Sequence, residues 1–206
     1  MEPTVAILRP ETKVVILDLD GTLYNKRGLA FYMVMNDLLE VPLLLNERRV
    51  RKGLRGVWLG TKDAYYNAFY HRMVSKRPYS ESFIRWWYNT CYMPLMVNEI
   101  RKHYRLQKWV RPFVEDCHKI GVRVVVLSDY ECVREKLAAL GAEDIQFDWV
   151  VSAPELGGLK PAPQLIDKVT EYMKVKSEQC FVIGDRDDTD GALARTMQVP
   201  YFLVKK

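Results

Sequence analysis

Two aspartates lie side by side directly after an apolar run near the start of the chain. Residues 13–22 read KVVILDLDGT, so Asp18 and Asp20 follow four consecutive aliphatic residues. Two neighbouring carboxylates repel each other unless a proton or a cation lies between them. The pair therefore indicates a chemical role rather than a contribution to folding stability.

Polar side chains also follow three other apolar runs. Ser128 ends the run VVVLS, Lys160 lies in GGLKPAP downstream of a third run, and the acid-rich loop GDRDDTDG, with Asp185 and Asp190, follows a fourth. Each has an ordinary explanation on its own, as a helix N-cap, a surface lysine or the acids of a turn. Their joint occurrence is harder to explain in this way, because the carboxyl ends of parallel strands meet at one edge of a sheet.

The set of side chains is suited to phosphoryl transfer. Clustered carboxylates bind a hard cation, and Mg²⁺ above all. One carboxylate can attack phosphorus while the metal and a lysine neutralise the phosphoryl oxygens. A second acid can protonate the leaving oxygen and then activate water, and a hydroxyl can donate a hydrogen bond to a phosphoryl oxygen. This chemistry amounts to ester hydrolysis through a phosphoaspartate.

The outer parts of the chain alternate short aliphatic runs with helical patterns. The runs are continuous in Val, Ile, Leu and Phe, as expected for strands covered on both faces. Helices are predicted from Pro112 to Gly121, over 130–140, from Pro163 onwards, and from Thr189 to before Pro200. The pattern predicts an α/β fold with a doubly wound, parallel, five-stranded (Rossmann-like) sheet. The predicted strands are 14–17, 122–127, 147–151, 181–183 and 201–204.

The middle of the chain, residues 25–110, has a different character. It holds 16 Lys and Arg against 6 Asp and Glu, together with 15 of the 24 aromatic residues. Its apolar residues recur at helical spacing over 31–40, 47–55, 61–75 and 80–104, with no convincing strand. We therefore predict an all-α insertion at 25–110 in a core domain built from 1–24 and 111–206.

The basic charge of the insertion leaves several interpretations open. Basic and aromatic residues together could bind nucleic acid, but we favour a solvated helical face over an aromatic core. A positive insertion could also focus an anionic substrate towards an acidic, metal-binding floor. One group of residues could engage a second anionic group of the substrate, although a solvated helix face is again the interpretation we favour. These residues are Arg48, Arg49, Arg51, Lys52 and Arg55.

Composition disfavours several other classes of protein. The sequence has no apolar run of the length that a membrane span needs, and the N-terminal residues do not resemble a secretory signal. Its four cysteines lie far apart, which disfavours a disulfide framework and a structural zinc site. We expect reduced thiols and a cytoplasmic location; the sequence gives no indication of oligomeric state.

The polar residues that follow the four apolar runs resemble the four motifs of the haloacid dehalogenase (HAD) superfamily. The run DLDGTL at 18–23, then Ser128, Lys160 and the loop at 184–191 match these motifs in order. The resemblance covers residues 13–24 and about 110–206, and the helical insertion resembles the C1-type cap of that family. It implies a HAD phosphatase that acts on a small phosphorylated metabolite, without nucleic acid or membrane as partner.

The resemblance also implies a role for each matched residue. Asp18 is the nucleophile and a ligand of Mg²⁺, and Asp20 is the general acid and base, with its main-chain carbonyl on the metal. Ser128 and Lys160 hold the phosphoryl group. Asp185 is the third protein ligand of Mg²⁺, and Asp190 acts through water or through a group that binds the metal.

Two alternatives to a Mg²⁺-dependent phosphatase remain. The superfamily also contains phosphomutases, which would use the same residues on the same fold. The other alternative is a catalytically quiet module in which the basic, aromatic insertion binds RNA or a protein partner. The acid pair and the acidic fourth motif favour phosphoryl chemistry over dehalogenation, which has no alkoxide to protonate.

Overall fold

The centre of the molecule is a parallel sheet of five strands in the order β3-β2-β1-β4-β5. The computed structural model describes residues 2–36, 40–75 and 78–204. Each predicted strand is present, and its bounds differ from the prediction by at most two residues. The strands are β1 (Val14–Leu17), β2 (Arg123–Ser128), β3 (Trp149–Ser152), β4 (Cys180–Gly184) and β5 (Tyr201–Leu203).

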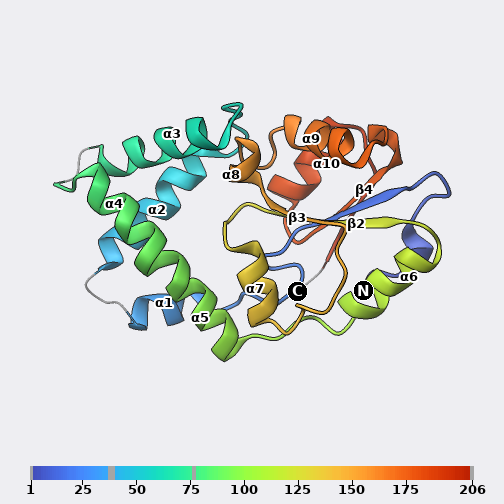
Figure 1. The fold of residues 1–206 in the computed structure, drawn as a ribbon, viewed down its shortest axis with the longest axis horizontal. Coiled ribbons are helices and arrows are strands. Elements are labelled where there is room, and N and C mark those ends of the chain that lie inside the picture. Colours follow the sequence, from blue (N-terminus) through green and yellow to red (C-terminus); the bar gives the residue numbers. More distant parts are fainter. Residues whose placement is uncertain (1, 37–39, 76–77, 205–206) are drawn as a thin grey trace.

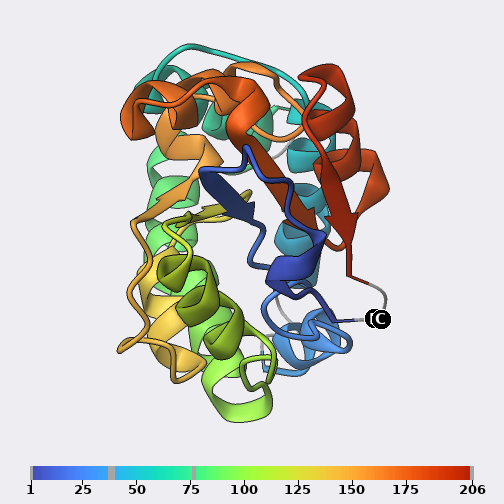
Figure 2. The same ribbon diagram turned by 90° about the vertical axis from the view of Figure 1, so that its right-hand side faces the viewer.

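Helices cover both faces of this sheet. Figures 1 and 2 show α6 (Val110–Lys119) and α7 (Val133–Ala139) on one face, with α9 (Gln164–Met173) and α10 (Ala192–Thr196) on the other. Every residue of β1 and β4 is buried as a result, which accounts for their continuous apolar sequences. The predicted doubly wound α/β fold is confirmed. Shorter helical turns are Val5–Ile7, α8 (Ala153–Leu156), Ser177–Gln179 and the π-helical turn Asp187–Gly191.

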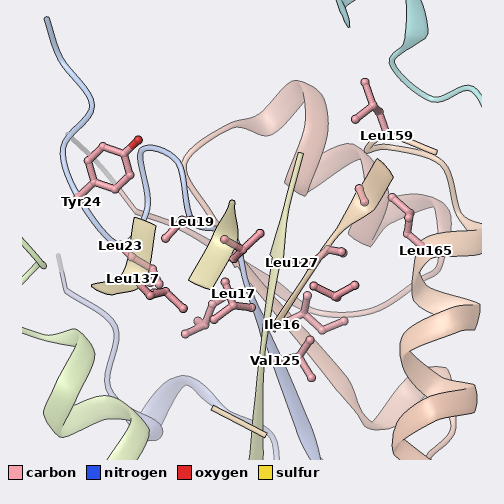
Figure 3. Packing of buried hydrophobic residues seen from close by; sticks show 14 of the residues in the cluster. Ile16, Leu17, Leu19, Leu23, Tyr24, Val125, Leu127, Leu137, Leu159 and Leu165 are labelled. Carbon is pink, nitrogen blue, oxygen red and sulfur yellow. The ribbon is translucent and has the colours of Figure 1, made fainter. Parts of the chain in front are cut away.

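The core packs against both sides of the central strands. Figure 3 shows Leu137 of α7 on one side of the strands and Leu165 of α9 on the other. Tyr172 of α9 does not belong to this core, since the residue is 58% exposed. Its ring instead stacks on Trp149 at 4.0 Å between centroids, so the tyrosine covers the outer edge of β3.

The chain between β1 and β2 forms a layer of helices beside the sheet (Figure 1). Within the described residues this insertion contains no strand, as predicted. The prediction placed the start of α2 too late, at residue 47. Pro42 is compatible with the first helical turn because the first N–H groups of a helix have no partner within it. The helices are α1 (Leu29–Asn36), α2 (Val41–Leu54), α3 (Lys62–Val74), α4 (Glu81–Trp87) and α5 (Met93–His103).

The predicted helix at 80–104 is present with an irregularity in its middle. A π-helical turn, Tyr88–Tyr92, joins α4 to α5. Pro94 follows this turn and has no N–H for a helical hydrogen bond, so regular α-helix geometry is interrupted there. Residues 37–39 of the predicted 31–40 helix lie outside the described residues.

Aromatic side chains form the interior of the insertion. Tyr65, Tyr66, Phe69 and Tyr70 of α3 are buried, as the helical spacing predicted. Phe83 and Trp86 of α4 are not part of this interior, since they are 37% and 53% exposed, whereas Trp87 of the same helix is fully buried. The division of the chain into domains at residues 24/25 and 110/111 stays a prediction.

Arg51 of α2 joins the insertion to the sheet. Its buried guanidinium donates to Glu47 Oε1 at 2.6 Å, Tyr88 Oη at 2.9 Å and the main-chain oxygen of Asp129 at 2.7 Å. The same group lies over the ring of Tyr130, 4.1 Å from its centroid. Since Asp129 and Tyr130 directly follow β2, this arginine fixes the insertion against the carboxyl end of the sheet.

A second attachment joins the two parts through main-chain hydrogen bonds. The N–H of Gly56 donates to the oxygen of Leu159 at 3.2 Å, and that of Leu59 donates to Gly157 at 2.7 Å. Trp58 and Gly158 form an isolated antiparallel bridge between the two segments. The loop that carries Lys160 is thus in direct contact with the insertion.

Across the described part of the chain, no helix combines the length and the apolar character needed to cross a membrane.

The contacts of Arg51 lead to a stability prediction. Arg51→Met leaves the buried carboxylate of Glu47 without its charged partner, so we expect the free energy of unfolding to fall by about 3–5 kcal/mol. Urea denaturation measures the change. Adding Glu47→Gln should recover part of the loss, and the exposed Arg49→Met is the matched control. A midpoint unchanged from wild type would contradict the importance of this contact.

Candidate active site

Asp18 is the first residue after β1 and lies at the carboxyl edge of the sheet. Its N–H donates to the oxygen of Ile183 in the neighbouring strand at 2.9 Å. Thr22 Oγ1 donates to Asp18 Oδ2 at 2.7 Å, which orients the carboxylate. Gly21 has φ of +108°, and a side chain there would collide with the Asp185 carboxylate. The glycine of the DLDGT run therefore permits both the turn and the approach of the fourth-motif loop.

The ammonium of Lys160 lies between the carboxylates of Asp18 and Asp190. Its Nζ lies 2.6 Å from Asp18 Oδ1 and 2.7 Å from Asp190 Oδ1, and it also donates to the oxygen of Leu127 at 3.3 Å. Burial alone would lower the pKa of this ammonium, but Asp18 and Asp190 raise it well above its usual value. The lysine therefore stays charged and neutralises the buried acids.

Three carboxylates form a cluster at the same edge. Single oxygens of Asp18, Asp185 and Asp190 all lie within 4.8 Å of one another. Burial is the main cause that raises the pKa of Asp190, to about 7. Gly184 allows Asp190 to lie close to the main chain, because a side chain at that glycine would overlap its carboxylate. A donor set made only of oxygens fits a hard divalent cation.

Lys26 is a cation of the site that the sequence prediction missed. Its ammonium donates to the main-chain oxygen of Asp20 and lies 3.7 Å from Asp185 Oδ2. These are two of the groups expected to bind Mg²⁺, so a positive charge already lies where the sequence predicts a metal. Lys26 follows the first motif closely, but its long side chain could have turned in several directions.

Asp20 is held by a separate set of partners. Lys136 Nζ lies 3.0 Å from its Oδ1 and 3.1 Å from its Oδ2. Tyr24 Oη donates to Oδ1 at 2.7 Å, and Ser128 Oγ donates to Oδ2 at 2.8 Å. Burial would raise the pKa of Asp20, but the charge of Lys136 and these hydroxyl groups outweigh it and the pKa lies below its usual value.

Lys136 is the second residue that the sequence prediction missed. It lies in α7, is fully buried, and contacts both oxygens of Asp20. A signal was present in the sequence, because Lys136 is three residues from Val133 and four from Leu140, on the apolar side of that helix. A lysine at such a position needs a buried acidic partner.

The structure brings together every residue that the sequence proposed for the site. Ser128 contacts Asp20, and Lys160 contacts Asp18 and Asp190, while Asp185 completes the carboxylate cluster. The two other acids of the fourth-motif loop take no part in this cluster. Asp187 pairs with Arg195, and Asp188 pairs with Arg186 and Arg55. The chemical roles assigned to these residues stay predictions.

A cavity of about 290 Å³ opens above Asp20. Asp20, Tyr130 and Arg186 line it from the core domain, and Lys26 and residues of α1, α2 and α5 line it from the insertion. Any ligand that reached Asp20 through this cavity would contact both parts of the chain.

A family model supports the relationship that the motifs suggest. The model describes haloacid dehalogenase-like hydrolases, and it matches residues 12–196. The chain belongs to this family. The parallel sheet described above is thus that of a hydrolase family.

Among characterised relatives, the chain is similar to a glyceraldehyde 3-phosphate phosphatase from Methanothermobacter thermautotrophicus. The two are 26% identical over 191 residues, which cover 86% of this chain and 79% of the relative. A second relative is the haloacid dehalogenase-like hydrolase domain-containing protein 3 of Xenopus laevis, 26% identical over 102 residues, or 50% of this chain and 42% of that protein.

Solved structures share the fold at lower sequence identity. A predicted phosphoglycolate phosphatase from Haemophilus somnus gives a TM-score of 0.64 at 17% identity and covers 94% of this chain and 85% of that one. A 2-haloacid dehalogenase from Pseudomonas syringae gives 0.61 at 18% identity, with coverages of 93% and 86%. These similarities show the fold alone, since a dehalogenase and a predicted phosphatase have nearly the same TM-score with this chain.

The ion pair of Lys136 with Asp20 can be tested through stability. Lys136→Met leaves a buried carboxylate without its cation, so we expect a loss of about 3–5 kcal/mol in the free energy of unfolding. Asp20→Asn in the same chain should restore part of that loss because no unpaired charge then remains. A double-mutant cycle in urea measures the coupling. A coupling near zero would show that the two side chains do not interact.

Proposed function

We propose that the protein is a Mg²⁺-dependent phosphatase that hydrolyses a small phosphate monoester through a phosphoaspartate on Asp18. The observation that carries the proposal is the contact of Lys160 with Asp18 at 2.6 Å beside the carboxylate cluster. A permanent positive charge beside a nucleophilic carboxylate is suited to an anionic substrate. The relative that is named a phosphatase adds support from sequence.

Asp18 is oriented for attack on phosphorus. Thr22 and Lys160 each hold one of its two oxygens, so the carboxylate cannot rotate freely. In the first step an oxygen of Asp18 forms a bond to phosphorus while the bond to the ester oxygen breaks. In the second step water forms a bond to phosphorus, and the bond to Asp18 breaks.

Asp20 moves the proton in both steps. It gives a proton to the departing alkoxide, and it takes one from the attacking water, so it ends each cycle as it began. Its pKa is low beside Lys136, but the negative charge of a bound phosphate favours uptake of a proton. Ser128 donates to Asp20 in the ligand-free protein and is the hydroxyl proposed to turn towards a phosphoryl oxygen.

The carboxylate cluster is the proposed metal site. Asp18, Asp185 and the main-chain carbonyl of Asp20 would hold Mg²⁺, and Asp190 would support them through Lys160. When bound, the ion would neutralise charge on the phosphoryl oxygens. The all-oxygen donor set and the approach of Lys26 both fit a position that favours a cation.

A test of the nucleophile uses an aryl phosphate. Asp18→Asn should lower the rate of p-nitrophenyl phosphate hydrolysis by at least about a thousandfold, because the amide is a poor nucleophile. EDTA should also abolish the wild-type rate, and Mg²⁺ should restore it. Arg49→Met is the control, since that side chain lies outside the site. Robust turnover by the asparagine variant would exclude the proposed route.

An analysis of the products formed from a sugar phosphate separates the phosphatase from the phosphomutase alternative. Wild-type protein is incubated with a hexose phosphate and the products are followed by phosphorus NMR. A phosphatase releases inorganic phosphate, whereas an isomerised sugar phosphate would identify a mutase.

Metal binding can be measured without turnover. Calorimetry should detect the binding of Mg²⁺, and Mg²⁺ should raise the thermal unfolding midpoint. Asp185→Asn should abolish both the binding and the rise in the midpoint. Lys26→Met removes an ammonium from the proposed ligands, so we expect Mg²⁺ to bind about tenfold more tightly to this variant. Weaker binding by Lys26→Met would mean that the lysine supports the metal rather than competes with it.

A further inference from the structure

One wall of the cavity above Asp20 is strongly basic. Arg48, Arg51, Lys52 and Arg55 all line it. Their spacing along α2 and the residue that directly follows it places them on one side of the helix, since residues three and four apart are neighbours on a helix surface. Arg49, the remaining basic residue of α2, lies outside the lining and is exposed.

The four cations differ in how far they are already neutralised. Arg51 is engaged by Glu47, Tyr88 and the main chain of Asp129. Arg55 pairs with Asp188 at 3.2 Å. Among the described residues, Arg48 and Lys52 have no ion pair and no side-chain hydrogen bond. Two cations beside a cavity therefore remain available to a ligand.

Two other helices of the insertion supply apolar side chains to the cavity. Leu29, Ala30 and Met33 of α1 and Met96 of α5 line it. The volume of about 290 Å³ lies at the small end of the range for ligand sites. The cavity thus fits a short carbon chain with charge at its ends, and its size argues against a polymer such as RNA.

We propose that the substrate is a short phosphate monoester with a second anionic group, a carboxylate or another phosphate, that binds Arg48 and Lys52. The proposal rests on the proposed function in that it assigns the phosphate end to Asp18. The other end then extends past Asp20 into the cavity, and the apolar wall contacts the carbon chain. Two cations without acidic partners gain charge-assisted hydrogen bonds only if such a group is present.

Binding of phosphonates tests the proposal without any turnover. Carboxyethyl phosphonate and propyl phosphonate have chains of similar length and differ in the terminal carboxylate. With Mg²⁺ present, calorimetry should show that the carboxylate compound binds at least about tenfold more tightly. Ethylene bisphosphonate, measured in parallel, distinguishes a carboxylate from a second phosphate: the compound that binds more tightly identifies the preferred group.

Variants of the basic helix assign the preference to residues. Arg48→Met and Lys52→Met should each reduce the preference for the anionic compounds by about tenfold and leave the affinity for propyl phosphonate unchanged. Arg49→Met is the matched control and should keep the full preference. Thermal unfolding midpoints confirm that each variant is folded, which we expect because both side chains are exposed.

The outcomes separate the two proposals. Equal affinity of wild type for the charged and uncharged phosphonates, or no binding of either, would overturn the second anionic site. An equal loss of preference in Arg49→Met would also overturn it, since a general effect of surface charge would then account for the data. Hydrolysis by Asp18→Asn is a separate measurement, so failure of the phosphatase proposal is recognised independently.

Discussion

The site depends on the balance between buried acids and the lysines among them. Asp18, Asp20 and Asp190 are each 7% exposed or less, and they lie at one edge of the sheet. Charges in such positions are strongly unfavourable unless they are paired. Lys160 pairs with Asp18 and Asp190, and Lys136 pairs with Asp20, so each lysine neutralises a different part of the site. This division keeps the first two acids chemically distinct although they are only two residues apart.

The parallel sheet is what allows this balance to form. Asp18 follows β1, Ser128 ends β2 and Asp185 follows β4, and these three strands are adjacent. Because the strands are short and buried, the residues after them are fixed by main-chain hydrogen bonds rather than by long side chains. The helical insertion then covers the same edge from the other side. Its attachment through Arg51 to the residue after Ser128 links the helix that lines the cavity to the carboxyl edge of the sheet.

The fold and most of the candidate site could be predicted from sequence because they depend on local patterns. Apolar runs, Gly and Pro indicated the strands and helices, and their alternation indicated a parallel, doubly wound sheet. The order of the strands came from the structure. Asp18, Ser128 and Asp185 could be assigned because each lies next to the end of a strand. Lys26 could not, since its long side chain acts at a distance from its own segment. The place of Lys136 on an apolar helix side indicated burial but did not identify its partner. The basic wall of α2 also required the structure, because only packing decides which side of a helix faces a cavity.

The loop that carries Lys160 is joined by main-chain hydrogen bonds to the insertion, so the two segments constrain each other's movement. Gly56 and Leu59 bind the main chain of Leu159 and Gly157, directly before Lys160. A side chain at Gly157 or Gly158 would overlap the main chain of the insertion, so the two segments are in close contact. Movement of this part of the insertion would therefore displace the lysine that neutralises Asp18. The part of the cavity lining that α1 and α5 supply is apolar, and none of these main-chain hydrogen bonds involves it.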